Sequence, residues 1–188
     1  AYTPDGLTFD VGNATREALT RGHGLSDEYS NGNGSLMRIL PLAFTAAGPS
    51  DIEAVSSITH AHATSVEACL LYVAIARRLL KGQQLPEILL GLETSTTYAR
   101  LQTLAELTED DIRSTGYVVD TLEAALWCLL TSTSYPETVL KAVNLGDDTD
   151  TVAAVAGGLA GIIYGLEGIP DNWLAQLRNK ELLESCLF

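Results

Sequence analysis

The segment from residue 152 to residue 166 constrains the fold of this chain more than any other. It contains no charged residue and is rich in alanine and glycine. This composition is typical of a helix packed tightly among other helices, and the segment is shorter than the roughly 20 residues that a bilayer-spanning helix needs. Gly157, Gly161 and Gly165 recur every four residues, so they would form a smooth stripe that a neighbouring helix can approach closely. The segment therefore predicts a buried core helix.

The rest of the chain also follows helical patterns, and strand signals are scarce. With 46% hydrophobic residues in a length of 188, the chain can bury a substantial core. Because many of the helices are short, the sequence predicts an all-α fold, a compact orthogonal multi-helix bundle that forms a single domain over residues 1–188. The expected helices cover residues 36–44, 52–58 (capped by Ser50 or Asp51), 65–80, 118–130 and 136–143, with others opening near Asp10, at Pro86, and at Asp171 or Asn172.

Charge and cysteine content limit the function classes. The net charge of −13 and the isoelectric point near 4.4 argue against a general nucleic-acid or anionic-membrane partner, because phosphate surfaces repel an acidic protein. Cys69, Cys128 and Cys186 are widely spaced, and the first two fall in apolar helical patterns. Buried free thiols indicate a reducing compartment, so we expect a cytoplasmic protein.

A dense polar cluster at residues 147–151 stands immediately before the core helix. It combines three carboxylates with two threonines, whereas helix capping needs only one oxygen side chain. Asp148 and Asp150 would diverge within a regular helix, so they converge only if Asp148 lies on the incoming turn and Asp150 in the first helical turn. Together with the Thr151 hydroxyl they would then offer hard oxygen ligands to Mg²⁺, Mn²⁺ or Ca²⁺. A multiply capped helix and a metal site are equally open on these residues alone.

A second unusual stretch, Ser-Asn-Gly-Asn-Gly-Ser at residues 30–35, precedes an apolar helix. Its glycines permit left-handed backbone angles and leave N–H groups free to point into a cavity. The helix N-terminus that follows favours an anion such as a pyrophosphate. The alternative is a tight turn capped by Asn33 or Ser35, which is the commoner use of Asn-Gly pairs.

Four segments, in this order, resemble the ADP-ribosylglycohydrolase family. They are N-G-N-G-S-L-M-R at 31–38, T-H-A-H at 59–62, S-T-G-Y-V-V-D-T-L-E-A-A-L-W at 114–127 and N-L-G-D-D-T-D-T-V-A-A-V-A-G-G-L-A-G at 144–161. The similarity is greatest to the bacterial type that includes the dinitrogenase reductase-activating glycohydrolase. Four ordered blocks with compatible spacing are far more specific than a single D-x-D pair.

The resemblance implies hydrolysis of the glycosidic bond between ADP-ribose and a modified protein side chain, with arginine the first choice. Asp148 and Asp150 would be the catalytic carboxylates. Asp148, Asp150 and Thr151 would be metal ligands in a centre of two Mg²⁺ or Mn²⁺ ions, with Asp147 as a cap or an outer partner. Substrate contacts are expected from Gly32, Asn33, Gly34, Ser35, Met37, His60 (or else His62) and Tyr117, with Arg38 as a phosphate or structural partner and Asp10 nearby.

The sequence departs from the family pattern in one respect. Family members usually carry, upstream, a G-D-A-L-G-like segment with a nearby Glu and a T-D-D motif, which this sequence does not contain. We therefore expect a C-terminal portion of a family member, with a half-built metal site and weak or no activity alone. The expected partners are an ADP-ribosylated protein or a small ADP-ribosyl conjugate, and the missing segment as a separate chain. The alternatives are an ADP-ribose-binding or structural pseudoenzyme and a helical interaction domain without a ligand.

Overall fold

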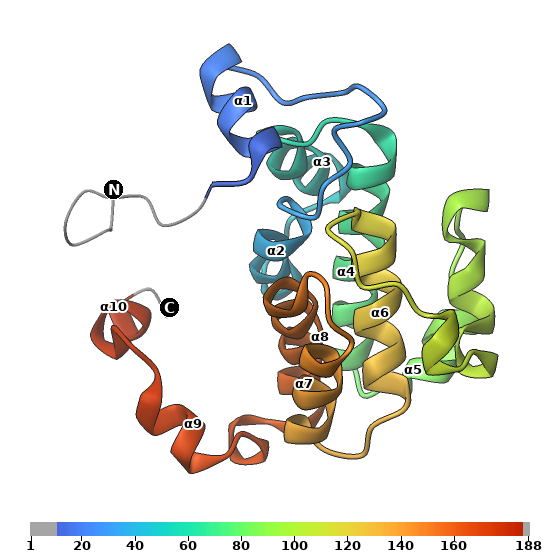
Figure 1. Cartoon of the computed structure of the whole chain (residues 1–188), viewed down its shortest axis with the longest axis vertical. Helices are drawn as coiled ribbons and strands as arrows, with labels where there is room; N and C mark the ends of the chain where they lie inside the picture. Colours follow the sequence, from blue (N-terminus) through green and yellow to red (C-terminus); the bar gives the residue numbers. More distant parts are fainter. Residues whose placement is uncertain (1–10, 186–188) are drawn as a thin grey trace.

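The computed structural model describes residues 11–185, and no strand occurs among them. The predicted all-α multi-helix fold is confirmed (Figure 1). The elements in chain order are α1 (Asn13–Arg21), α2 (Leu36–Ile39), the 3-10 helix η1 (Leu40–Phe44), α3 (Pro49–Ser57), α4 (Ala63–Leu80), α5 (Leu85–Leu90), η2 (Thr96–Glu106), η3 (Glu109–Asp111), α6 (Val118–Leu130), α7 (Tyr135–Asn144), α8 (Thr149–Tyr164), η4 (Leu166–Gly168), α9 (Asp171–Gln176) and α10 (Lys180–Ser185).

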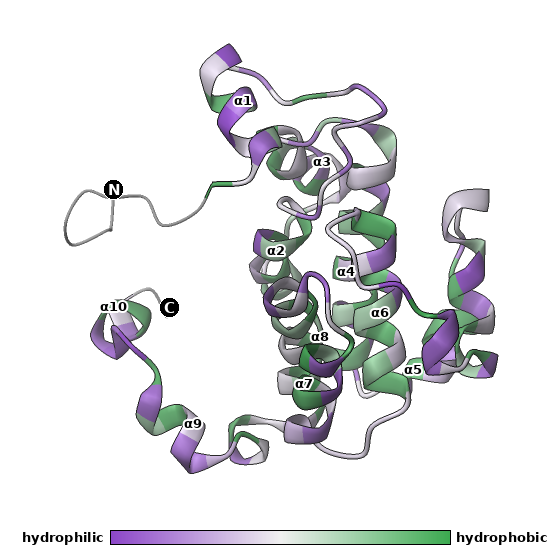
Figure 2. Cartoon of the chain, in the orientation of Figure 1, coloured by the Kyte–Doolittle hydropathy of each residue, from purple (hydrophilic) through white to green (hydrophobic). Residues whose placement is uncertain are grey.

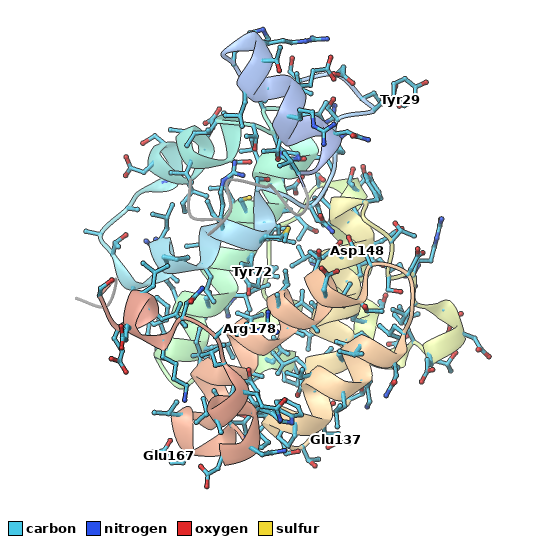
Figure 3. All side chains as sticks on the ribbon, turned by 60° about the vertical axis from the view of Figure 1, so that its left-hand side comes forward. Tyr29, Tyr72, Glu137, Asp148, Glu167 and Arg178 are labelled. Carbon is cyan, nitrogen blue, oxygen red and sulfur yellow. The ribbon has the colours of Figure 1, made fainter. Side chains whose placement is uncertain are left out.

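The centre of the molecule is formed by α4, α6 and α8, with α7 packed against α8 and α2 against both α4 and α8. Figure 2 shows apolar residues gathered on these central helices, while α1 and the C-terminal helices are more polar. Val152, Val155 and Leu159 of α8 are buried, so the predicted core helix is confirmed. Tyr72 of α4 reaches across to α8, where its hydroxyl donates to the Val155 carbonyl oxygen at 2.8 Å (Figure 3). Within residues 11–185, no helix has the length and apolar character needed to cross a membrane.

Most predicted helix positions agree with the structure, and the differences have local causes. The predicted bounds of α6 are those observed. The helix expected over 36–44 instead changes after Ile39 into η1, because Pro41 has no N–H to continue the α-helical ladder. At the start of α3 the residue in the cap position is Gly48, and the Asp51 carboxylate accepts its N–H at 2.7 Å. Asp51 therefore caps this helix from inside its first turn.

The predicted glycine stripe on α8 is only partly correct. A Cβ at Gly157 would lie 3.3 Å from the Tyr135 hydroxyl of α7, so this position does permit a close approach. A Cβ at Gly161 would meet nothing within 4 Å, and Gly165 ends the helix with a positive φ of 69°. The tightest position is Gly158, where a Cβ would stand 2.6 Å from Leu40 Cδ2. Neighbouring side chains therefore pack closely against α8 at Gly158 as well, on a face that the four-residue spacing does not predict.

Cys69 and Cys128 are free and buried, as predicted. Cys186 and Asp10 lie outside the described residues.

Candidate active site

Two loops that are far apart in the sequence pair with each other at one end of the bundle. Gly32 and Tyr117 form an isolated antiparallel bridge. On either side of it, the Asn33 N–H donates to the Gly116 carbonyl at 3.1 Å and the Val118 N–H donates to the Asn31 carbonyl at 3.0 Å. The Asn-Gly loop is therefore held beside the start of α6 by backbone hydrogen bonds.

Asp148 joins this pair of loops from the start of α8. Its N–H donates to the Ser114 carbonyl at 3.0 Å, and its Oδ2 accepts a hydrogen bond from Asn33 Nδ2 at 2.7 Å. Asn33 Nδ2 also donates to Thr121 Oγ1 at 2.9 Å. A Cβ at Gly116 would lie 3.3 Å from Asp148 Oδ2, so the absence of a side chain at Gly116 leaves room for the carboxylate. The side-chain amide of Asn33 therefore fixes the Asp148 carboxylate at the point where three segments of the chain meet.

The polar cluster at 147–151 spans the turn before α8 and the first turn of that helix. Asp148 is the N-cap residue of α8 and Asp150 lies in the first turn, as convergence required. The Asp148 side chain makes no hydrogen bond to the first-turn N–H groups, so it does not cap the helix. Thr151 is buried, and its hydroxyl lies 3.9 Å from Met37 Sδ. Asp147 adopts φ 58° and lines a separate cavity beside Arg113 rather than turning towards Asn33.

His60, rather than His62, lies against the Asn-Gly loop. A Cβ at Gly34 would stand 2.9 Å from His60 Cε1, and one at Gly32 would stand 3.5 Å from His60 Nε2. His60 is only 2% exposed, and its Nδ1 lies 2.7 Å from Thr59 Oγ1. His62 instead caps α4, where its Nδ1 accepts the Thr64 N–H at 3.2 Å.

Burial, aided by the positive charge of Arg38, lowers the pKa of His60 to about 4. The ring is therefore neutral near pH 7. Arg38 donates to Thr59 Oγ1 at 2.6 Å and so fills one acceptor position of this hydroxyl. The Thr59 proton is then available to His60 Nδ1, which favours the tautomer with its N–H on Nε2, facing the loop.

The other predicted residues of the loop segment point in different directions. Arg38 donates to the Gly34 carbonyl and to carbonyls at the end of α3, so it holds the loop in the manner of a structural residue. The Ser35 hydroxyl is buried and lies 3.5 Å from Cys69 Sγ, from which it accepts. Met37 is largely exposed. The structure therefore brings Gly32, Asn33, Gly34, His60 and Asp148 together, while the Ser35 side chain turns into the core.

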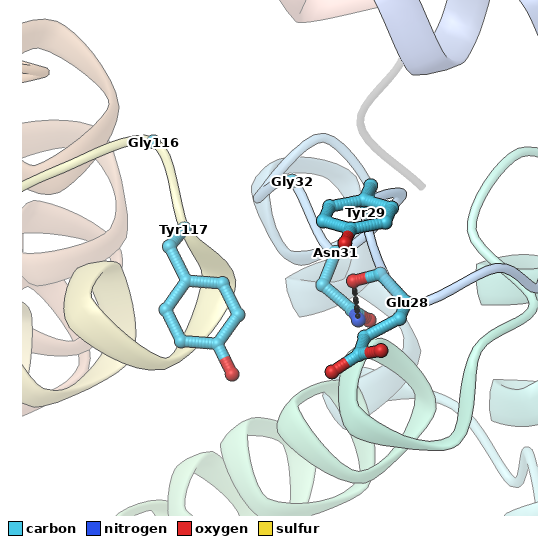
Figure 4. Close-up of a pocket in the computed structure, with 6 residues that line it drawn as sticks. All are labelled: Glu28, Tyr29, Asn31, Gly32, Gly116 and Tyr117. Carbon is cyan, nitrogen blue, oxygen red and sulfur yellow. Dashed lines mark hydrogen bonds between the residues drawn. The ribbon is translucent and has the colours of Figure 1, made fainter.

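Tyr117 borders a pocket of about 380 Å³, which is within the usual size range for small-molecule sites. Its ring is 42% exposed at the N-cap position of α6. Partial burial, together with the negative charges of Asp120 and Glu28, raises the pKa of Tyr117. The residues around the pocket are Glu28, Tyr29, Asn31, Gly32, Gly116 and Tyr117 (Figure 4).

Several residues of the site were not singled out from the sequence. Thr121 receives the Asn33 amide, and its own hydroxyl donates to the Thr115 carbonyl at 2.9 Å. Thr59 links Arg38 to His60. Both lie within the segments quoted above for the family resemblance: Thr59 precedes His60, and Thr121 lies about one helical turn after Tyr117. Glu28 and Tyr29 carry no pattern that indicates a site, and only the folded loop places them at the pocket.

Comparison with known proteins identifies the family. A model of the ADP-ribosylglycohydrolase family matches residues 2–187. The chain belongs to the ADP-ribosylglycohydrolase family. An ADP-ribosylarginine hydrolase Tri1 from Pseudomonas putida is 39% identical over 92% of the chain and 51% of its own length. The ADP-ribosyl-[dinitrogen reductase] glycohydrolase of Rhodospirillum rubrum is 32% identical over 91% of the chain and 61% of its own length.

A solved structure of an ADP-ribosylglycohydrolase-related protein complex confirms the fold. It superposes with a TM-score of 0.75 at 32% sequence identity, and the match covers 93% of this chain and 66% of that one. This member of the ADP-ribosylglycohydrolase family thus spans about half the length of the Tri1 relative and less than two thirds of the other proteins named here.

Proposed function

We propose that this chain takes part in hydrolysis of the glycosidic bond between ADP-ribose and a modified protein side chain, with arginine as the acceptor. The observation that carries the proposal is the position of Asp148, whose carboxylate is fixed by Asn33 beside the Asn-Gly loop and the Tyr117 pocket. The names of two relatives support arginine, because both are called ADP-ribosylarginine hydrolases. The relatives are longer than this chain, so the activity proposed is that of the complete family domain.

In this proposal the Asn-Gly loop binds the ADP-ribose. The absence of side chains at Gly32 and Gly34 leaves room for the neutral His60 ring, which packs against the loop. An Nε2–H donor on His60 would bind a hydroxyl or phosphate oxygen without adding a full positive charge. Cleavage at the anomeric carbon builds positive charge on the ribose ring, which a fixed carboxylate such as Asp148 stabilises.

The residues present fit a divalent metal in part. Asp148, Asp150 and Thr151 supply oxygen atoms, which Mg²⁺ and Mn²⁺ prefer, and Asp148 Oδ1 makes no hydrogen bond in the described part of the chain. Within residues 11–185, however, no group of three His, Cys, Asp or Glu side chains is arranged to hold a metal. We propose that these three residues are part of a ligand set completed by other groups. A bound ion of this kind would lower the pKa of a water and orient the ribose hydroxyls.

Two neighbouring carboxylates provide a matched test. Asp148→Asn removes the negative charge fixed by Asn33, whereas Asp147→Asn removes a charge one residue away that lines a different cavity. Asparagine tolerates the left-handed backbone of position 147, so the control should fold normally. ADP-ribose binding would be measured by calorimetry with Mg²⁺ and with EDTA, together with release of ADP-ribose from an arginine-ADP-ribosylated protein.

We expect the chain to bind ADP-ribose in a Mg²⁺-dependent manner and to release it from protein weakly or not at all. Asp148→Asn should weaken Mg²⁺-dependent binding by about a hundredfold, while Asp147→Asn should bind as the unmodified chain does. Absence of ADP-ribose binding with Mg²⁺, and of any rise in melting temperature, would contradict the proposal, because a ligand of the folded state must stabilise it.

A further inference from the structure

Thr121, near the start of α6, is a polar side chain that is completely buried. Its hydroxyl takes part in two hydrogen bonds. It donates to the Thr115 carbonyl at 2.9 Å and accepts from Asn33 Nδ2 at 2.9 Å. A threonine inside a helix usually donates to the carbonyl four residues before it. Neither partner of Thr121 lies within α6, so its hydroxyl connects the helix to two other segments of the chain.

The proton of the Thr121 hydroxyl determines which end of the Asn33 amide faces it. Because this proton is donated to the Thr115 carbonyl, the Thr121 oxygen can offer only a lone pair to Asn33. A lone pair accepts an N–H and repels an amide oxygen. The Asn33 amide must therefore turn its NH2 group towards Thr121.

The same NH2 group holds Asp148, because its other hydrogen is donated to Asp148 Oδ2 at 2.7 Å. In the opposite orientation, the amide oxygen of Asn33 would face the carboxylate, and two acceptors at this distance repel each other. A ligand that binds Asp148 competes for the carboxylate oxygens, whereas the bond to Thr121 involves no atom of Asp148. Thr121 therefore keeps the amide in the required orientation whether or not Asp148 has bound a ligand.

The Thr115 carbonyl belongs to the turn that holds the Asp148 backbone. The residue before it, Ser114, accepts the Asp148 N–H on its carbonyl at 3.0 Å. The Thr121 oxygen is thus bonded to the turn that holds the Asp148 backbone and to the amide that holds the Asp148 carboxylate.

We propose that Thr121 is a positioning residue for the reaction, which acts through the Asn33 amide on the Asp148 carboxylate. Because Thr121 is completely buried, it acts without touching ADP-ribose. It keeps Asp148 Oδ2 bonded to Asn33 and so leaves Oδ1 for a ligand. This inference rests on the proposed function, since the effect on binding passes through Asp148.

Thr138 of α7 provides a matched control. It is also completely buried, and its hydroxyl donates to the Ser134 carbonyl at 2.9 Å, four residues earlier. Among the described residues, this hydroxyl accepts no hydrogen bond. Thr121→Val and Thr138→Val therefore both remove a buried hydroxyl from a helix, but only the first removes a partner of Asn33.

ADP-ribose binding with Mg²⁺ would be measured by calorimetry at a temperature where each variant is folded. Thr121→Val should weaken binding by about tenfold, as expected for loss of a group that orients a ligand-binding carboxylate. Thr121→Ala, which leaves no methyl group against the Asn33 amide, is the second hydroxyl-free variant and should behave alike. Thr121→Ser restores the hydroxyl and should restore most of the affinity. Thr138→Val should melt at a lower temperature but bind ADP-ribose as the unmodified chain does.

The side-chain NH2 resonances of Asn33, in the ¹⁵N-labelled chain without Mg²⁺ or ADP-ribose, provide a direct measurement of the amide. We expect them to shift in Thr121→Val and Thr121→Ala and to stay in place in Thr138→Val. A merely structural role of Thr121 would change the melting temperature without this difference.

The outcomes separate this inference from the proposed function. Binding that is lost in Asp148→Asn but unchanged in the hydroxyl-free variants of Thr121 overturns the inference alone. Unchanged Asn33 resonances in those variants, an equal loss of binding in Thr138→Val, or no recovery in Thr121→Ser does the same. Failure of the unmodified chain to bind ADP-ribose overturns the proposed function and this inference with it.

Discussion

The two ends of α8 are built in opposite ways. At its start, Asp148 is bonded to the Ser114 carbonyl and to Asn33, so segments from three parts of the chain meet there. At its end, Gly165 turns the chain out of the helix, and the residues of α9 and α10 are mostly exposed (Figure 1). Trp173 of α9 contacts the bundle through its ring, whose centroid lies 6.3 Å from that of the Tyr135 ring in α7. The segment after Gly165, which contains α9 and α10, is called the C-terminal arm below.

This difference indicates where the structure must be specific. Polar groups joined across 115 residues of sequence, as Asn33 and Asp148 are, give a fixed position to a carboxylate. The C-terminal arm is made of short helices with few partners. Substitutions at the start of α8 should therefore alter both stability and ligand binding, whereas those in the C-terminal arm should have local effects.

The largest effect is expected from replacing Asn33. Asn33→Ala removes the hydrogen bonds to Thr121 and to the charged Asp148, and leaves both acceptors near a largely buried position. We expect a loss of about 2–4 kcal/mol in the free energy of unfolding, measured by urea denaturation. Asn33→Asp should be at least as damaging, because a second carboxylate would face Asp148 at the same place. Unchanged stability in both variants would show that the amide does not hold the Asp148 carboxylate.

The next comparison uses two glycines of the same helix. Gly158→Ala places a methyl group 2.6 Å from Leu40 Cδ2 and 2.9 Å from the Tyr72 hydroxyl, and should cost about 1–3 kcal/mol. Gly161→Ala meets nothing within 4 Å and should stabilise α8 by about 0.5–1 kcal/mol. Thermal unfolding of both variants checks this prediction. Equal shifts in melting temperature would mean that α8 is not packed as described.

These glycines also show what the sequence can and cannot indicate. The periodic apolar residues of α6 and α8 predict both helices, because the pattern is local. Which face of α8 is crowded depends on where Leu40 and Tyr72 lie, and no spacing within the helix contains that information. The four-residue spacing therefore predicts close packing at Gly161, where there is open space, and does not predict it at Gly158, where the packing is tight.

The candidate site divides in the same way. Helix geometry identifies the positions that Asp148 and Asp150 must take for their side chains to converge, and the two residues do occupy the N-cap and the first turn of α8. The hydrogen bond from Asn33 to Asp148 is a tertiary contact, and so is the burial of Ser35 against Cys69. Tyr29 is the extreme case, because an aromatic residue in a polar loop indicates nothing until the loop is folded beside Tyr117.

A smaller effect is expected from the pH dependence of His60. Its pKa is about 4 in the folded chain and near 6.5 when unfolded, so the unfolded chain binds more protons between these values. Its contribution to stability is therefore complete above pH 6.5 and is lost as the pH falls towards 4. Between pH 6.5 and 5, we expect the free energy of unfolding to fall by about 1 kcal/mol less in the His60→Gln variant than in the unmodified chain. His23→Gln, at an exposed position, is the control and should leave the unfolding curve against pH unchanged.

The smallest change in global stability is expected at the far end of α8. Trp173→Ala removes the edge-to-face contact with Tyr135, whose rings are inclined at 63°, and such pairs contribute about 0.5–1.5 kcal/mol. Because α9 and α10 have few other partners, the loss should appear as faster amide exchange over residues 166–185, with little shift in melting temperature. Trp173→Phe keeps an aromatic ring and should restore most of the protection. ADP-ribose binding should be unaffected, since Asn33 and Asp148 lie at the opposite end of the helix. A loss of binding in Trp173→Ala would show that the two ends of α8 are coupled.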